Sequence, residues 1–384
     1  MASNIRPAGI FDTSYEDDMS LERTRFDKIR AYALFAALLL IPLLTRQGPL
    51  GLDILPPYII ATVNTIAIFV IAAQGLNILV GYTGQISLGH AAFMAVGAYS
   101  GSLLARGFDF TIGESLIVIP SIPFWFAVPI AAVITGIVGL IFGLPSLRVK
   151  GFYLAMATLA AQFIIPWVLE HPLGGLTNAP RPLQDIPAPE LFGLNFSSAG
   201  AMYYIIIPVA VFMMLAARNI IRTRTGRAFI SIRDNDLAAE LLGINIFNYK
   251  LQAFFLSAVY AGVAGALIAF DQNTLSIESF KLNTSIELLS MLVIGGAGFP
   301  LAAVFGVSFV KLLTLVLIPT VGGPLFNSFL PTLLPFIEPV NIGAAISPIL
   351  TGLVLIAFLI LEPRGLAYRW EILKIAWKIR PYSY

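Results

Sequence analysis

The chain has 384 residues, of which 58% are apolar and only 11% are charged. A soluble domain carries about a quarter charged residues, so this composition excludes an ordinary soluble enzyme, a nucleic-acid-binding protein and a disordered scaffold. The formal net charge is +2, and the chain has no cysteine and two histidines, which excludes disulfides, thiolate sites and histidine-rich metal centres. The composition predicts a polytopic membrane protein.

Apolar runs between polar or Gly/Pro-rich segments predict an all-α membrane bundle of about ten transmembrane helices. The predicted spans are 31–44, 57–80, 86–105, 120–144, 151–169, 200–217, 251–270, 285–297, 300–318 and 343–361. They form one transmembrane domain, 31–361, between polar tails at 1–30 and 362–384.

The basic residues indicate how these spans are oriented. With the N-terminus in the cytoplasm, 18 of the 23 lysines and arginines fall in cytoplasmic segments. Because cytoplasmic loops of membrane proteins carry an excess of Lys and Arg, both termini are expected in the cytoplasm. The mixed charges of residues 1–30 are not those of a cleaved signal peptide.

The segment between the second and third spans combines glycines with polar side chains. Its candidate substrate-pathway residues are Gln74, Asn77, Thr83, Gly84, Gln85, Ser87 and His90. Irregular backbone inside a membrane needs protein or a water-filled cavity around it, and broken transporter helices often point their N-termini at anionic groups. Two interpretations stay open: a break that lines a path for an amino acid, or a cytoplasmic turn that caps two helices. We interpret His90 as a hydrogen-bonded structural residue rather than a proton relay.

Other features concern helix packing and charge inside the spans. Gly97 and Gly101 form a Gly-x-x-x-Gly pair, which predicts close helix contact. Lys311 is a basic residue within a span, where a charge often marks function, although a lysine can also snorkel to the membrane edge. The glycine-rich segment 295–300 is expected to break the eighth span. Its similarity to residues 80–97 indicates an inverted repeat.

Residues 218–250 form a long internal loop that holds six of the basic residues. Asp234 or Asn235 can cap a short helix over 236–242, and Gly243 can end it. Such a helix suits docking onto a soluble partner, and the alternative is a solvated connector. The docking candidates are Arg227, Arg233, Asp234, Asn235, Asp236, Ala238, Ala239, Glu240 and Gly243.

Three stretches resemble the permease subunits of branched-chain amino acid (leucine/isoleucine/valine) ABC importers. The first, at 75–99, is GLNILVGYTGQISLGHAAFMAVGAY, which is similar to a signature of one of the two paired permease subunits. The second, at 226–245, is GRAFISIRDNDLAAELLGIN, which resembles the cytoplasmic EAA-type loop. The third, at 294–306, is IGGAGFPLAAVFG. The loop departs from the general ABC motif in having Leu237 in place of glutamate.

The resemblance implies a permease of the bacterial inner membrane that imports branched-chain or related hydrophobic amino acids. It also implies three kinds of partner besides the lipid bilayer: a second permease subunit, two cytoplasmic ABC ATPase subunits and a periplasmic substrate-binding protein. A permease of the same family for urea, amides or aromatic acids is the alternative. The chain has no G-x-x-x-x-G-K-[ST] motif. We therefore expect ATP hydrolysis on a separate chain, and no enzymatic activity, cofactor or nucleic-acid partner here.

Two other classes of protein fit the sequence less well. An ion-coupled secondary carrier would need carboxylates within the membrane, and of the 21 acidic residues only Glu287 falls inside a predicted span. A membrane enzyme would need clustered Asp, His or Cys near an interface, and the two histidines, His90 and His171, lie far apart in the chain.

Overall fold

The protein is described by a computed structural model. The described residues are 37–44, 57–112, 115–146, 152–171, 173–177, 181–191, 194–322, 349, 352–358, 360–362 and 364–379. The chain divides into two units, Met1–Ile60 and Ala61–Tyr384. In the first unit, residues 37–40 are helical and are followed by the 3-10 helix η1 (Ile41–Leu44). The predicted tail at 1–30 lies outside the described residues.

Five of the described helical segments are long and apolar enough to cross a membrane. They are α3 (Pro57–Leu76) with its π-helical continuation η2 (Asn77–Tyr82), α5 (Phe124–Ser146), α6 (Phe152–Glu170), α8 (Ala199–Arg222) and α11 (Ile246–Gln272). Shorter helices fill other predicted spans: α4 (His90–Arg106), α12 (Leu282–Gly295) and α13 (Ala302–Leu312), which continues into η4 (Leu313–Gly322). The helical membrane bundle is confirmed, whereas the count of ten spans is not.

The remaining elements are short. They are the hairpins β1–β2 (Phe108–Ile112, Ser115–Ile119) and β3–β4 (Glu190–Leu191, Leu194–Asn195), and the helices α7 (Gly174–Thr177), α9 (Arg224–Asp234), α10 (Asp236–Leu241), η3 (Ile277–Phe280) and α16 (Gly365–Ile379). Both hairpins are antiparallel, and Phe108 of β1 pairs with Ile119 of β2. The sequence did not predict the hairpins.

Residues 218–250 are mostly helical rather than a loop. Helix α8 continues to Arg222, α9 and α10 follow, and α11 already begins at Ile246. Helix α9 is amphipathic: Phe229 and Ile232 are buried in the bundle, while Arg227 on another side is exposed. Burial of an apolar face stabilises such a short helix, which propensity alone does not.

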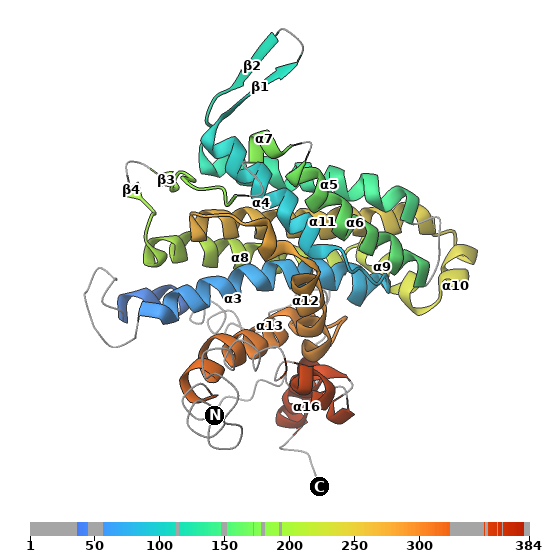
Figure 1. The fold of residues 1–384 in the computed structure, drawn as a ribbon. Coiled ribbons are helices and arrows are strands. Elements are labelled where there is room, and N and C mark those ends of the chain that lie inside the picture. The colour runs from blue at the N-terminus through green and yellow to red at the C-terminus, as the bar shows by residue number, and fades with distance from the viewer. Residues whose placement is uncertain are drawn as a thin grey trace, which may run out of the picture. The chain divides into compact units, whose positions relative to one another are not determined.

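The core forms where α4, α5 and α11 pack against one another (Figure 1). A Cβ atom placed on Gly97 would come within 2.4 Å of the Gly262 backbone, and one placed on Gly101 would lie 3.0 Å from Ala266. Small residues therefore let α4 and α11 approach closely. The paired positions rise together in sequence, so these two helices run parallel.

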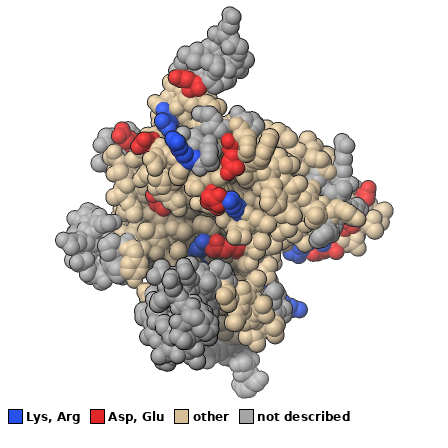
Figure 2. All heavy atoms as spheres, viewed as in Figure 1, with Lys and Arg blue, Asp and Glu red and all other residues tan. Residues whose placement is uncertain are grey.

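The outer faces of α5 and α6 carry large exposed apolar side chains. Phe126, Ile141 and Phe163 are among them, each more than half exposed. Figure 2 shows that one face of the molecule is mostly uncharged, with Lys, Arg, Asp and Glu confined to a few groups. Exposed apolar side chains at this density suit the hydrocarbon of a bilayer.

Candidate functional site

The chain is non-helical between the end of the η2 helix at Thr83 and the start of α4, at residues 84–89, which we call the first break. At its start, the Gln85 amide nitrogen lies 3.5 Å from the carbonyl of Lys250, close to the N-terminus of α11. At its end, His90 Nε2 lies 2.9 Å from the carbonyl of Ala72. Ala72 precedes Tyr82 by ten residues, which is at most about 15 Å of helix. The first break therefore turns at the end of η2 and returns along this helix, so that α4 begins beside the last turns of α3.

The backbone donors at the start of α4 are satisfied by side chains from two other helices. Leu88 N–H donates to Thr158 Oγ1 at 3.0 Å, and Ala92 N–H donates to Gln162 Oε1 at 3.1 Å, both on α6. Ala91 N–H donates to Ser285 Oγ of α12 at 2.9 Å. Irregular backbone within a membrane protein persists where side chains provide such partners. These N–H groups consequently have acceptors within the chain itself.

The sequence did not single out Thr158, Gln162 and Ser285. Gln162 and Ser285 form one network, because Ser285 Oγ also donates to Gln162 Oε1 at 2.8 Å, and Gln162 Nε2 donates to the Phe280 carbonyl at 2.7 Å. All three side chains are buried. The sequence signal that could have identified Thr158 and Gln162 is their spacing. Two polar residues four positions apart lie on one side of an otherwise apolar helix.

The candidate pathway residues lie along the first break and the end of α3. Six of the seven are buried, and Gly84, with a φ of +70°, is exposed. Thr83 Oγ1 accepts from Gln85 Nε2 at 3.0 Å. Three of their buried oxygens have no hydrogen-bond partner in the described part of the chain: Gln74 Oε1, Gln85 Oε1 and Ser87 Oγ. His90 is fully buried against α3, as a structural histidine would be.

A second break, residues 296–301, separates α12 from α13 and confirms the interruption predicted in this region. Gly296 and Gly298 have φ values of +96° and +91°, which side chains other than glycine rarely adopt. The Asn77 amide joins the end of α3 to this break. Its Oδ1 accepts from Gly298 N–H at 2.8 Å, and its Nδ2 donates to the Phe299 carbonyl at 2.9 Å. The two glycine-rich segments, far apart in sequence, thus lie in contact.

The residues predicted to dock a partner lie on α9, α10 and the turns around them. As predicted, Asn235 caps a short helix, because its side chain accepts from Ala238 N–H at 3.1 Å, and Gly243 follows that helix with a φ of +83°. Arg227 Nη1 donates to the Arg222 carbonyl at 3.2 Å. In Figure 2, charged side chains of both signs gather at the end of the molecule that carries α9 and α10.

Helix α10 differs from the rest of this region in its exposed apolar side chains. Leu237, Leu241 and Leu242 are 64%, 90% and 80% exposed, whereas Ala239 is buried. Asp236 and Glu240 belong to the same short helix. The leucines of α10 and of its C-terminal cap therefore form an exposed apolar surface. No other described residue of the chain covers it.

Arg233, at the last turn of α9, is exposed on one side, and its guanidinium also contacts the main chain of η2. Its Nη1 donates to the Gly81 carbonyl at 2.9 Å, and its Nη2 pairs with the neighbouring Asp234 at 3.0 Å. A Cβ placed on Gly298 would lie 2.8 Å from the same Nη1. All three of the stretches that carry the family resemblance therefore meet at this arginine.

Lys311, which the sequence left open, forms an ion pair. Its Nζ lies 2.8 Å from Glu287 Oε1 of α12 and 3.8 Å from the centre of the Phe69 ring of α3. The pair thus links α12 and α13 and lies against α3. Glu287, the acid that the sequence placed inside a span, has a cationic partner.

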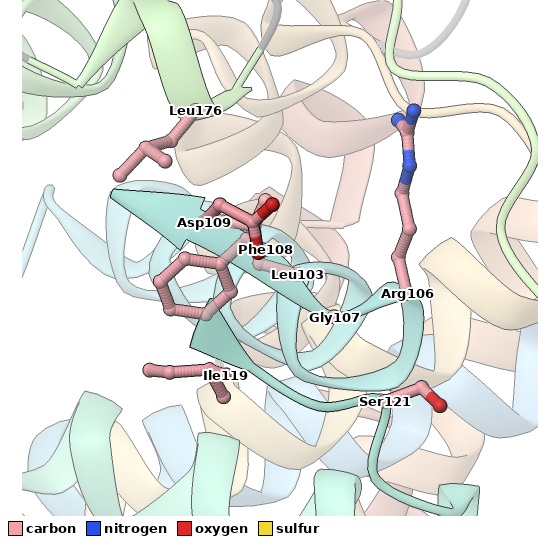
Figure 3. Close-up of a pocket in the computed structure, with 8 residues that line it drawn as sticks. All are labelled: Leu103, Arg106, Gly107, Phe108, Asp109, Ile119, Ser121 and Leu176. Carbon is pink, nitrogen blue, oxygen red and sulfur yellow. The ribbon is translucent and has the colours of Figure 1, made fainter. Parts of the chain in front are cut away.

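The cavity drawn in Figure 3 lies elsewhere, at the other end of α4. It has a volume of about 560 Å³, and none of the predicted site residues line it. Arg106 and Asp109 are its charged lining residues, and the Arg106 side chain extends away from the strand that carries Asp109 (Figure 3). The cavity is open to the outside, and its lining includes no residue of the two breaks or of α9 and α10.

Comparison with known proteins agrees with these features. The family model for the branched-chain amino acid transport system / permease component matches residues 58–359. The chain belongs to this family. It is 31% identical to the high-affinity branched-chain amino acid transport system permease protein LivM of Escherichia coli and to that of Salmonella typhimurium, over 62% of this chain and 58% of each relative.

A more limited similarity links the chain to a transporter of another solute. The nucleoside ABC transporter permease protein NupC of Lactococcus lactis is 30% identical over 32% of this chain and 41% of the relative. The matched segments therefore cover less than two thirds of each of these relatives. No solved structure matches the chain.

Proposed function

We propose that this chain is the permease subunit of an ATP-driven importer of branched-chain amino acids in a bacterial inner membrane. The family and the names of its LivM relatives support the class of substrate. The distribution of basic residues supports an orientation in which both termini and the α9–α10 end are cytoplasmic. We infer the partners to be a second permease subunit, two ATPase subunits and a periplasmic binding protein.

The observation that carries this proposal is the exposed apolar surface of α10. Burying a leucine side chain stabilises by about 1.5–3 kcal/mol, and three leucines of α10 or its end are mostly exposed. Helix α9 anchors this surface, because its other face is buried in the bundle. A short apolar helix held on a packed support suits a groove on a soluble ATPase.

The charges within the bundle support this function over an ion-coupled carrier. Glu287 is paired with Lys311, and Asp271, at the end of α11, accepts a hydrogen bond from Asn64 Nδ2 at 3.0 Å. A carboxylate that couples transport to protons or sodium must be released from its partner in each cycle. The partners of these two carboxylates favour structural roles.

Copurification tests the docking role. The double substitution L241S/L242S alters two side chains that lie outside the core, so the purified chain is expected to stay monodisperse. The ATPase subunit is expected no longer to copurify with it. The control is L373S, which alters a leucine that is 61% exposed on α16. Undiminished copurification of the ATPase with L241S/L242S would contradict the docking role.

Uptake competition tests the substrate. Cells that express the whole importer are expected to accumulate labelled leucine, with inhibition by isoleucine and valine but not by urea, benzoate or a nucleoside. Inhibition by one of the last three and not by valine would reassign the substrate within the family.

A further inference from the structure

We propose that Arg233 is a positioning residue that fastens α9 and α10 to both glycine breaks, so that these three parts move as one body. The proposal rests on the proposed function, in which α10 is the surface that the ATPase moves. In this role Arg233 does not contact the partner. It transmits the motion of α10 to the four helices that border the breaks, which are α3 with η2, α4, α12 and α13.

The first step is the contact between Arg233 and the end of α3. The last carbonyls of a helix have no partners within it, and the Gly81 carbonyl lies in the last turn of η2. Arg233 Nη1 donates to it at 2.9 Å. A guanidinium at a helix C-terminus also interacts favourably with the helix dipole. Arg233 thus caps the helix that leads into the first break.

The second step is the close contact that both breaks make with this arginine, which is exposed on its other side. A Cβ on Gly81 would lie 2.4 Å from Gly298 N, and a Cβ on Gly84 would lie 3.3 Å from Arg233 Cγ. Both breaks and the arginine are therefore in van der Waals contact. A shift of α9 by even one ångström would have to displace the breaks or break the hydrogen bond, because packed interiors transmit displacement.

The third step is that η2, which leads into the first break, is already joined to the second break. The Asn77 amide of η2 bonds both Gly298 and Phe299. Arg233 therefore needs only its one bond to Gly81 of η2 in order to carry both. At the start of the second break, a Cβ on Gly296 would lie 2.6 Å from the Arg364 carbonyl, so the start of α16 belongs to the same junction.

The fourth step is the rigidity of the connection from α10 to Arg233. The residue between α9 and α10 is the cap Asn235, two positions beyond Arg233. The Asn235 N–H also donates to the Ser231 carbonyl of α9 at 3.0 Å. These bonds leave no free linker between the exposed leucines of α10 and the arginine.

The test measures uptake per ATP hydrolysed by the assembled importer. For R233Q we expect ATP hydrolysis to persist and uptake per ATP to fall about tenfold or more, the usual effect of losing a hydrogen bond to a charged group. The control is K374Q, which removes an exposed cation from α16. Coupling of R233Q as tight as that of the wild type would overturn the proposal.

A disulfide provides a second, independent test. A Cβ at Gly84 would lie 3.8 Å from Arg233 Cβ, the spacing typical of a disulfide, and the chain has no cysteine of its own. In G84C/R233C we expect poor coupling in the reduced protein and recovery on oxidation, since the disulfide replaces the lost fastening. The strain of a side chain at position 84 is common to both redox states.

The two outcomes of oxidation have opposite meanings. Recovered coupling supports a unit that moves as one body, whereas uptake that stays low or falls further means that α9 must move against the first break, which overturns the proposal. If R233Q does not assemble with its partners, the uptake per ATP of oxidised G84C/R233C decides whether the proposal holds. Failure of the proposed function is distinguishable, because the wild-type importer itself would then show no ATP-dependent uptake of leucine.

Discussion

Replacing Lys311 with leucine is expected to destabilise the bundle, because it leaves a carboxylate unpaired between membrane-level helices. In the wild type, Lys311 Nζ lies 2.8 Å from Glu287 Oε1, and the side chains are only 10% and 29% exposed. Water therefore cannot fully solvate Glu287 once the lysine is gone. The ammonium would also be lost from its place over the Phe69 ring.

The geometry sets the size of the effect. At an effective dielectric constant near 20, charges this close attract by about 6 kcal/mol, and most of that offsets the cost of removing them from water. Breaking a buried pair by removing one partner costs about 3–5 kcal/mol. Because Glu287 is partly exposed, we expect K311L to lower the free energy of unfolding by about 3 kcal/mol, the lower end of this range. The double substitution K311L/E287L leaves no unpaired charge, so it is expected within about 1 kcal/mol of the wild type.

The assay is equilibrium unfolding of the purified protein in mixed micelles of dodecyl sulfate, for both single variants and the double variant. A double-mutant cycle then yields the coupling energy of the pair. The exposed Lys374 supplies the control K374L, which is expected to change little. The reasoning fails if K311L unfolds like the wild type, or if the double variant is as unstable as K311L.

Two further predictions concern the breaks and the C-terminal helix. A Cβ in G81A would lie 2.1 Å from Asn77 Oδ1, so the yield of monodisperse protein should collapse, whereas G352A, with nothing within 4 Å, should express like the wild type. The hydrogen bond from Arg369 lowers the pKa of Glu362. The contribution of this pair is therefore fully present above the ordinary carboxyl pKa of about 4.3 and is lost as the pH falls through the lower folded value. Tryptophan fluorescence from α16 should change in that acid range in the wild type and not in E362Q; identical profiles would refute this.

Composition and local pattern were enough to predict the class of protein and several details. A chain with 11% charged residues must bury its helices in lipid, and apolar runs of membrane length do not depend on distant contacts. The Asn235 cap and the left-handed Gly243 were predictable for a similar reason, since each involves residues only a few positions apart. The glycines of 295–300 likewise indicated where a helix stops.

Long-range contacts were beyond the reach of such patterns. The sequence placed Arg233 among the docking candidates, but it could not show that packing of α9 also brings Arg233 to the carbonyl of Gly81, 152 residues away. Thr158, Gln162 and Ser285 looked like ordinary polar residues within spans, and only the arrangement of helices makes them the partners of the α4 backbone. Local sequence specifies which groups need a hydrogen-bond partner. Which distant side chain supplies it depends on how the helices pack, because burial leaves these groups no water to bond instead.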